Sequence, residues 1–135
     1  MLRPTRIYVD AVNAAKAVGD ALHGAAHITG GGLLENPQRA LADDLAVELD
    51  LSALRPPPIL RAIAAQGVPH PEMLRTFNCG VGMILYVDPD AAAAVTDALT
   101  AQGEIVTPIG VVAPRGDADA PQVRIRGDVD LFDRS

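Results

Sequence analysis

The sequence predicts an α+β fold, a single layered domain in which a mixed β-sheet is covered by helices. Segments with helical periodicity alternate with β-prone segments along the chain, and one apolar run, residues 80–87, is typical of an internal strand. The 135 residues match the size of one domain. Hydrophobic residues make up 49% of the chain and charged residues 21%, which is typical of a folded chain and not of a disordered one.

The first part of the chain predicts a strand, a helix and a second strand. Residues 6–9 form a β-prone run. Asp10 is a suitable N-cap for a helix over residues 11–22, where apolar residues share one stripe at helical spacing, and Gly24 is its expected end. Residues 25–29 then predict a short strand that leads into three glycines.

The middle of the chain predicts one strand and several short helices. Residues 33–41 have a helical pattern, which Pro37 breaks unless a new first turn begins there. Residues 46–51 alternate imperfectly and predict a strand. Residues 55–58 must be extended, because a residue before proline is excluded from the helical region. Two further short helices are expected, over residues 59–65 and 70–77.

The last part predicts a buried strand, a helix and a group of short strands. Residues 80–87 predict a strand buried on both faces. Residues 91–102 share an apolar stripe and predict a helix that ends at Gly103. The expected strands after it are 104–106, 109–112 and 123–126, with a polar turn over 115–121. The domain is thus expected to span residues 1–127, followed by a loose tail over 128–135.

Composition excludes several classes of partner and compartment. The net charge is −6 and Lys16 is the one lysine, so neither nucleic acid nor a membrane surface is expected as a partner. The sequence contains no apolar membrane span and no signal-peptide core. Cys79 is the one cysteine, so an internal disulfide is impossible, and no zinc-ligand spacing occurs. We therefore expect a cytoplasmic protein.

Residues 27–36, with the sequence HITGGGLLEN, are the most informative stretch. Three glycines between a strand and a helix let main-chain N–H groups approach an anion, and a helix beginning near Leu33 would add its positive end. Thr29 offers a hydroxyl, and His27 can change charge near neutral pH. The pattern is neither a P-loop nor a dinucleotide fingerprint. The alternative is a tight turn beside a buried histidine.

A second stretch, residues 75–82, offers further candidate ligands. Arg75 can contact a phosphate or carboxylate, and Asn78 can bond a ligand amide, while Gly80 permits close approach of the main chain. The structural alternative places Cys79 in the core and uses Asn78 to cap a turn. Cys79 has no neighbouring base and an apolar context, so we do not expect a nucleophile there.

The remaining titratable groups suggest structural or solvated positions. Their spacing provides no fixed scaffold for a metal ion, so no metal site is expected in this chain. The acidic pairs that we expect in solvated loops are Asp43–Asp44, Asp117/Asp119 and Asp128/Asp130, and the histidines that we expect at the surface are His23 and His70.

Several separated blocks together resemble one known family. They are residues 4–9 (PTRIYV), 27–36, 50–52 (DLS), 57–59 (PPI), 72–83 (EMLRTFNCGVGM) and 103–106 (GEIV). In order and spacing they resemble the C-terminal half of phosphoribosylformylglycinamidine cyclo-ligase, also called AIR synthetase, over residues 4 to 112. Formylglycinamidine ribonucleotide synthase, thiamine-monophosphate kinase and selenide,water dikinase share the two-domain plan of that family.

The resemblance implies an ATP-dependent ligase of purine biosynthesis that closes formylglycinamidine ribonucleotide to aminoimidazole ribonucleotide. Family members carry an N-terminal domain whose aspartate-rich and DGVGTK-like segments hold magnesium and ATP. No such segment occurs in this sequence. We therefore expect ATP and magnesium to belong to the full-length enzyme, no cofactor to bind this chain tightly, and no activity of the chain alone. The implied partners are the missing N-terminal domain, a phosphoribosyl substrate and, when full length, a second copy.

Carried over to this sequence, the resemblance places the glycine turn in a cleft between the two domains, facing the substrate phosphate or the nucleotide. His27 becomes a candidate for moving a proton. The residues implied in substrate or phosphate binding are Thr29, Gly30, Gly31, Gly32, Asn78 and Gly80. Two alternatives stay open: a stand-alone module that binds a phosphorylated metabolite, and an interaction domain whose exposed apolar face pairs with another copy.

Overall fold

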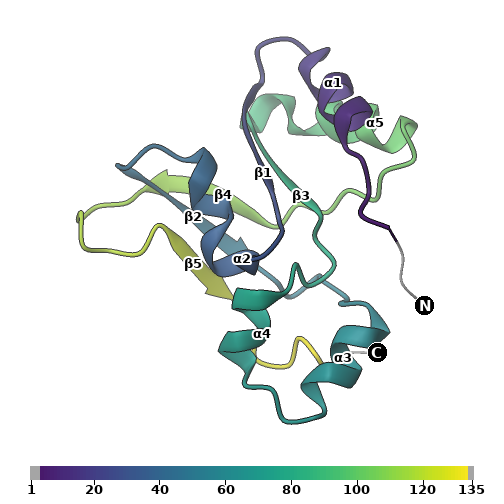
Figure 1. The fold of residues 1–135 in the computed structure, drawn as a ribbon. Helices are drawn as coiled ribbons and strands as arrows, with labels where there is room; N and C mark the ends of the chain where they lie inside the picture. The colour runs from purple at the N-terminus through teal and green to yellow at the C-terminus, as the bar shows by residue number, and fades with distance from the viewer. Residues whose placement is uncertain (1–3, 134–135) are drawn as a thin grey trace. The chain divides into compact units, whose positions relative to one another are not determined.

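The computed structural model describes residues 4–133 (Figure 1). Helices and strands both contribute, which confirms the predicted α+β class. The helices are α1 (Val9–Lys16), α2 (Gly32–Glu35), α3 (Pro58–Ala64), α4 (His70–Thr76) and α5 (Ala92–Ala101), with 3₁₀ turns η1 (Pro37–Ala40) and η2 (Pro89–Ala91). The strands are β1 (Leu22–His27), β2 (Leu45–Asp50), β3 (Met83–Val87), β4 (Gly110–Pro114) and β5 (Val123–Arg126).

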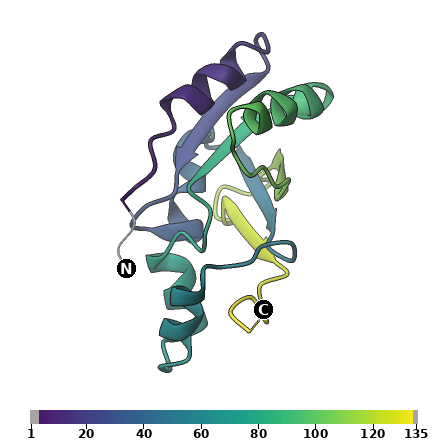
Figure 2. The ribbon, with the colours of Figure 1, turned by 90° about the vertical axis from the view of Figure 1, so that its right-hand side faces the viewer.

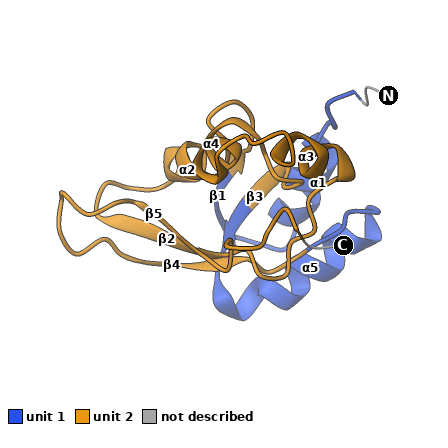
Figure 3. Cartoon of the chain, turned by 90° about the horizontal axis from the view of Figure 1, so that it is seen from below, with its two compact units in different colours: residues 1–25, 85–106 blue, residues 26–84, 107–135 orange. Residues whose placement is uncertain are grey.

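The strands form two sheets instead of one, and the larger of the two is mixed, as the sequence predicts. One sheet pairs β1 with β3, and the other has the order β4-β2-β5. The chain divides into two compact units, shown in different colours in Figure 3. Unit 1 contains residues 1–25 and 85–106, and unit 2 contains residues 26–84 and 107–135. Of the three divisions along the chain, those at 25/26 and 84/85 fall within β1 and β3.

Unit 1 is built on two helices that lie side by side, α1 and α5 (Figures 1 and 2). Ala11 and Ala15 of α1 are buried against Val95 and Leu99 of α5. Alanines on the facing side of α1 let Val95 and Leu99 lie close to the α1 main chain, because α1 contributes only methyl groups to this contact. The partly buried side chains around this cluster are Val18, Leu22, Leu85, Val87 and Val106.

Unit 1 differs from the sequence-based prediction in three places. Residues 4–8 form no strand, because the β-prone run at 6–9 finds no strand to pair with and α1 begins at Val9. The α1 helix ends at Lys16 instead of continuing to residue 22, since the chain turns at Gly19, whose φ is +97°. Residues 104–106 also form no strand.

Strands β1 and β3 pair antiparallel. The Ile28 N–H donates to the Gly82 carbonyl and the Asp88 N–H to the Ala21 carbonyl, each at 3.0 Å, and these bonds lie at opposite ends of the pair. The sequence predicts burial of β3 on both faces. Burial instead alternates along β3. Ile84 and Tyr86 are buried and their neighbours are partly exposed, because one face of this two-stranded sheet is covered more completely than the other.

The three-stranded sheet of unit 2 confirms the predicted strands near 46–51 and 123–126. Central β2 pairs antiparallel with β4 and parallel with β5, so that Val47 lies opposite Val112 on one side and Val123 on the other. Val47 and Leu49 are buried on one face of β2, and Glu48 points to the exposed face. The large aliphatic and methionine side chains that are fully buried in this unit are Ile28, Leu33, Leu49, Leu51, Met73 and Leu131.

The C-terminal segment is a packed part of unit 2, and the expectation of a loose tail is wrong for residues 128–133. Leu131 is fully buried and Phe132 is 9% exposed. Asp128 Oδ2 lies 2.9 Å from His70 Nε2, and the His70 ring meets the Phe132 ring edge to face at 5.4 Å. His70 and Asp128 are therefore partly buried partners, not separate surface residues. Residues 134–135 lie outside the described part of the chain.

Within residues 4–133, no helix has both the length and the apolar character that crossing a bilayer requires.

Candidate anion-binding site at the glycine turn

The three glycines form a tight turn that one main-chain hydrogen bond closes. The Gly32 N–H donates to the Thr29 carbonyl oxygen at 2.9 Å, which spans the four residues of a β-turn. Gly31 occupies position i+2 of this turn with φ +107° and ψ −18°, close to the left-handed geometry of a type II turn. Glycine suits this position because it has no Cβ to strain that conformation.

The carboxamide of Asn36 holds this turn from inside the protein. Asn36 is 1% exposed and is the one buried polar residue among residues 4–133. Its Oδ1 accepts from the Thr29 N–H at 2.7 Å, and its Nδ2 donates to the Gly30 carbonyl at 3.2 Å. Asn36 is not among the site residues predicted from the sequence. An available signal was the tendency of asparagine to bond nearby main chain instead of continuing a helix, here directly before Pro37.

Two of the three glycines keep their N–H groups available. Gly30 is exposed, Gly31 is partly exposed and Gly32 is buried. Within the described residues, the N–H groups of Gly30 and Gly31 meet no protein acceptor, whereas the Gly32 N–H is bonded within the turn. Consecutive main-chain donors of this kind can be satisfied by water or by an anion. Of the three glycine N–H groups that the sequence suggests as anion ligands, those of Gly30 and Gly31 are therefore the two available ones.

Gly32 has a packing function. A Cβ at position 32 would overlap the carbonyl oxygen of Leu74 and would lie 2.7 Å from that of Phe77. Gly32 also has φ +54°, which disfavours any side chain. The absent side chain lets α2 contact the end of α4, and this contact fixes the glycine turn in unit 2.

The expected contribution of a helix dipole is not present at full strength. The sequence predicts a helix over residues 33–41, but α2 ends at Glu35 and Pro37 begins a separate 3₁₀ turn. A single helical turn sums few peptide dipoles, so its positive end is weak. Anion binding at this turn must therefore depend on the two glycine N–H groups themselves.

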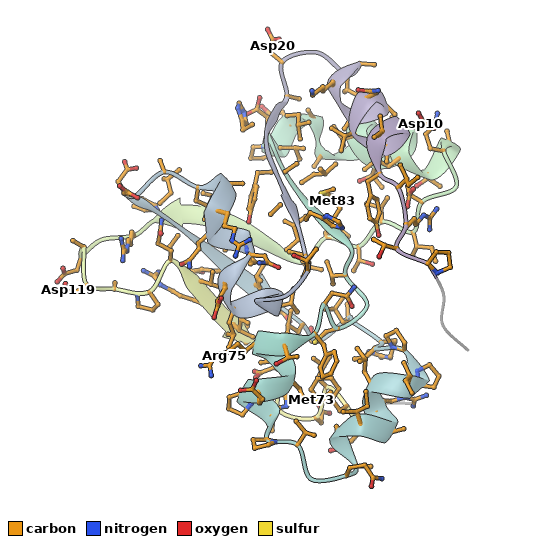
Figure 4. All side chains as sticks on the ribbon, viewed as in Figure 1. Asp10, Asp20, Met73, Arg75, Met83 and Asp119 are labelled. Carbon is orange, nitrogen blue, oxygen red and sulfur yellow. The ribbon has the colours of Figure 1, made fainter. Side chains whose placement is uncertain are left out.

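Charged side chains of both signs lie near the turn. The Glu35 Oε2 lies 3.2 Å from the place that a Cβ on Gly31 would take. The Arg75 Nε lies 4.0 Å from Glu35 Oε1, and its Nη1 lies 3.5 Å from Glu72 Oε2. These long, exposed ion pairs hold Arg75 weakly. Figure 4 shows Arg75 directed outward from α4.

His27 and Thr29 lie on either side of Ile28 at the end of β1. Both are exposed, whereas Ile28 between them is buried, as the alternation of a strand requires. The alternative prediction of a buried histidine beside the turn is therefore wrong. The Thr29 N–H donates to Asn36 Oδ1, and the Thr29 carbonyl accepts from the Gly32 N–H. Both main-chain groups of Thr29 therefore stabilise the turn.

Asn78 forms a turn of its own, as its structural alternative predicts. Its Oδ1 accepts from the Gly80 N–H at 3.0 Å, and its carbonyl accepts from the Val81 N–H at 2.9 Å. Gly80 has φ +91°, and a Cβ there would lie 3.1 Å from the Pro57 side chain. The geometry thus explains Asn78 and Gly80 by local structure.

Cys79 is a core residue. It is 1% exposed and has φ +54°, unusual for a residue with a side chain. Burial raises the pKa of its thiol to about 11. A thiol that stays protonated is a poor nucleophile, in agreement with the sequence-based expectation.

The acidic residues of the loops do not assemble into a metal site. In the part of the chain that the structure describes, no three His, Cys, Asp or Glu side chains lie close enough to hold a metal ion. Asp119 lies at the tip of the turn between β4 and β5, and Asp20 at the tip between α1 and β1 (Figure 4). The acidic side chains of the described residues thus do not provide a set of ligands that fits a magnesium ion.

A family model described as the C-terminal domain of AIR synthase related proteins matches residues 1–120. The chain belongs to this family. The match covers most of the chain and includes the glycine turn, Asn36 and the Asn78–Gly80 turn. This AIR synthase related domain also contains β5 and the buried residues Leu131 and Phe132, which lie beyond the matched range.

Proposed function

We propose that this AIR synthase related domain contacts the phosphate of a nucleotide or phosphoribosyl substrate in an ATP-dependent cyclo-ligase. The reaction is the closure of formylglycinamidine ribonucleotide to aminoimidazole ribonucleotide. The observation that supports it is the pair of available N–H groups on Gly30 and Gly31, held in place by a buried carboxamide. Main-chain donors bind a phosphate oxygen without requiring a basic side chain.

In this reaction the γ-phosphoryl group of ATP passes to the formyl amide oxygen, and ADP leaves. An amidine nitrogen then attacks the activated carbon, the C–O bond to the phosphoryl group breaks, and inorganic phosphate leaves as the ring closes. Such chemistry depends mainly on positioning and on stabilising charge. The glycine turn contributes positioning, by holding one anionic group of the substrate at a fixed main-chain site. His27, exposed two residues before Thr29, is the candidate for moving a proton.

The enzyme activity is tested by mixing the chain with the separately produced ATP-binding N-terminal domain of an AIR synthetase. We expect ADP release that depends on formylglycinamidine ribonucleotide in the mixture and none from either part alone. A Gly31→Ala variant should reduce that release, because its Cβ would strain the turn and crowd Asn36 Nδ2 at 2.8 Å. The absence of ADP release from two folded, associated partners would contradict the proposal.

Binding is tested separately by calorimetry with substrate, product and ATP. Heat from the phosphoribosyl compounds without turnover would favour a stand-alone binding module. Silence with all three would remove the phosphate-binding function from the isolated chain.

A second candidate function is self-association, which exposed apolar residues of unit 1 favour. Arg6 Nη2 lies 3.1 Å from Glu104 Oε1 and joins the segments before α1 and after α5. The neighbouring Ile7 is 83% exposed and Ile105 is 94% exposed. Exposed apolar side chains favour association when they form one contiguous patch. Light scattering should then show concentration-dependent dimers that Ile105→Ser weakens, and a monomer at every concentration would exclude this function.

A further inference from the structure

We infer that Asn36 is a positioning residue, which orients the Gly30–Gly31 peptide so that the Gly31 N–H faces solvent and can bind an oxyanion. The inference rests on the proposed function, because it concerns the same turn. The two hydrogen bonds of Asn36 let a turn of flexible glycines present an N–H donor instead of a carbonyl acceptor.

The geometry of one peptide unit carries the argument. A trans peptide is planar, and its C=O and N–H bonds point in opposite directions. The Gly30 carbonyl points at the Nδ2 of Asn36, which is 1% exposed. The Gly31 N–H of the same peptide must therefore point away from the buried carboxamide, and Gly31 itself is partly exposed.

Without this bond the opposite orientation would compete. Glycine on both sides of a peptide permits rotation of its plane, because neither residue has a Cβ that selects one conformation. The rotated peptide would turn the Gly31 N–H inward and the Gly30 carbonyl oxygen outward, where it would repel an anion. It would also leave the buried Nδ2 of Asn36 without an acceptor, which is strongly unfavourable.

The carboxamide is held at both of its ends. Its Oδ1 accepts from the Thr29 N–H at 2.7 Å, so the side chain cannot turn over without losing this bond as well. A donor and an acceptor on one short side chain are thus both required. Aspartate has the same shape but, when ionised, offers only acceptors. Asn36→Asp therefore tests the donor while it preserves the size of the side chain.

Two charged side chains near Gly31 have opposite effects on a bound anion: Glu35 repels it and Arg75 attracts it. The Glu35 carboxylate lies beside Gly31, and Arg75 lies near Glu35. Glu35→Gln should therefore tighten anion binding without changing the direction of the Gly31 N–H. This variant provides a matched control, since it alters charge at the turn and leaves both Asn36 bonds in place.

The experiment uses the ¹⁵N-labelled chain with sulfate as the probe. In the wild type we expect rapid solvent exchange of the Gly31 N–H, slow exchange of the Thr29 N–H, and a Gly31 shift on sulfate titration. In Asn36→Asp, if the outward orientation falls to about one tenth of the population, sulfate affinity falls about tenfold. Gly31 exchange should slow in that variant, while amides remote from the turn keep their shifts.

Distinct outcomes separate this inference from the proposed function. A folded Asn36→Asp variant that binds sulfate as the wild type does would overturn the role of Asn36 and leave the anion site intact. Slow exchange of the wild-type Gly31 N–H would overturn it too, and this readout remains if the variant fails to fold. No sulfate response at Gly31 in a wild type with rapid Gly31 exchange would instead overturn the anion-binding claim itself.

Discussion

The carbonyl oxygen of Leu74 lies directly against Gly32, so that the last residue of the glycine turn packs on the main chain of α4. This contact brings together two stretches that are separate candidate sites in the sequence, residues 27–36 and 75–82. It assigns one of three adjacent glycines to packing and leaves the other two, which are more exposed, at the surface.

Replacing Gly32 with alanine should destabilise the domain far more than replacing Gly30. At position 32 the new Cβ would overlap main-chain atoms of α4 in a left-handed backbone, and we expect a loss of at least about 3 kcal/mol. At position 30 a Cβ would meet nothing within 4 Å, so the change should stay within about 0.5 kcal/mol. Urea denaturation measures both. Equal losses would show that the contact with Leu74 is not the cause.

Leu131→Ala should destabilise unit 2 although the residue lies beyond the range that the family model matches. Leu131 is 0% exposed, and removal of a buried leucine side chain costs about 2–5 kcal/mol. Val129 is 92% exposed, so Val129→Ala is the matched control and should change little. A thermal melt of each variant measures the difference. If Leu131→Ala melts as Val129→Ala does, the C-terminal segment is not part of the core.

The thiol of Cys79 should resist alkylation in the folded protein. With its pKa raised to about 11 by burial, compared with an ordinary value of 9.0, its thiolate fraction at pH 8 is about a hundredfold lower. Iodoacetamide should therefore react at least that much more slowly with the native chain than with the urea-unfolded chain. Because the native state keeps this proton longer, stability should also fall as pH rises between 9.0 and 11. Equal alkylation rates in the two states would contradict the buried thiol.

Asp50 should titrate below its ordinary pKa of 3.8, chiefly because of hydrogen bonds from Ser52 and to a smaller extent because of Arg126. The lowered pKa means that this carboxylate stabilises the fold above about pH 4, and that the contribution is lost as pH falls through the native pKa. Carbon-detected NMR titration should show a larger upward shift in Ser52→Ala than in Arg126→Ala. The reverse order would make the ion pair the main cause.

Helices and strands with clear local signals were predictable. The alternating pattern near residues 46–51, the proline in the first turn of α4 and the apolar stripe of α5 depend on neighbours in sequence, and each of these elements is found. The β-prone residues 6–9 and 104–106 were misread, because a strand needs a partner strand and propensity alone does not provide one. The helix over residues 11–22 was too long, because Gly19 turns the chain before the apolar stripe ends.

The position of the candidate site was predictable from the sequence, but the roles of its residues were not, because those roles depend on contacts with other parts of the chain. Residues 27–36 predicted the glycine turn, since three glycines after a strand permit the backbone conformations that a tight turn requires. The roles of the individual glycines were not predictable: Gly32 is set by α4, more than forty positions along the chain, and Gly31 is set by the buried Asn36.

From its sequence alone, this chain could be assigned to the α+β class and to the family of the AIR synthase related C-terminal domain. The sequence alone also indicated the glycine turn as the candidate site. Tertiary structure decided that the strands form two sheets, that Leu131 closes the core, and that Asn36 directs the Gly30 carbonyl inward. This difference arises because turn and helix preferences depend on interactions between neighbours in sequence. Strand pairing, burial and the satisfaction of buried polar groups depend on which distant residues the folded chain brings together.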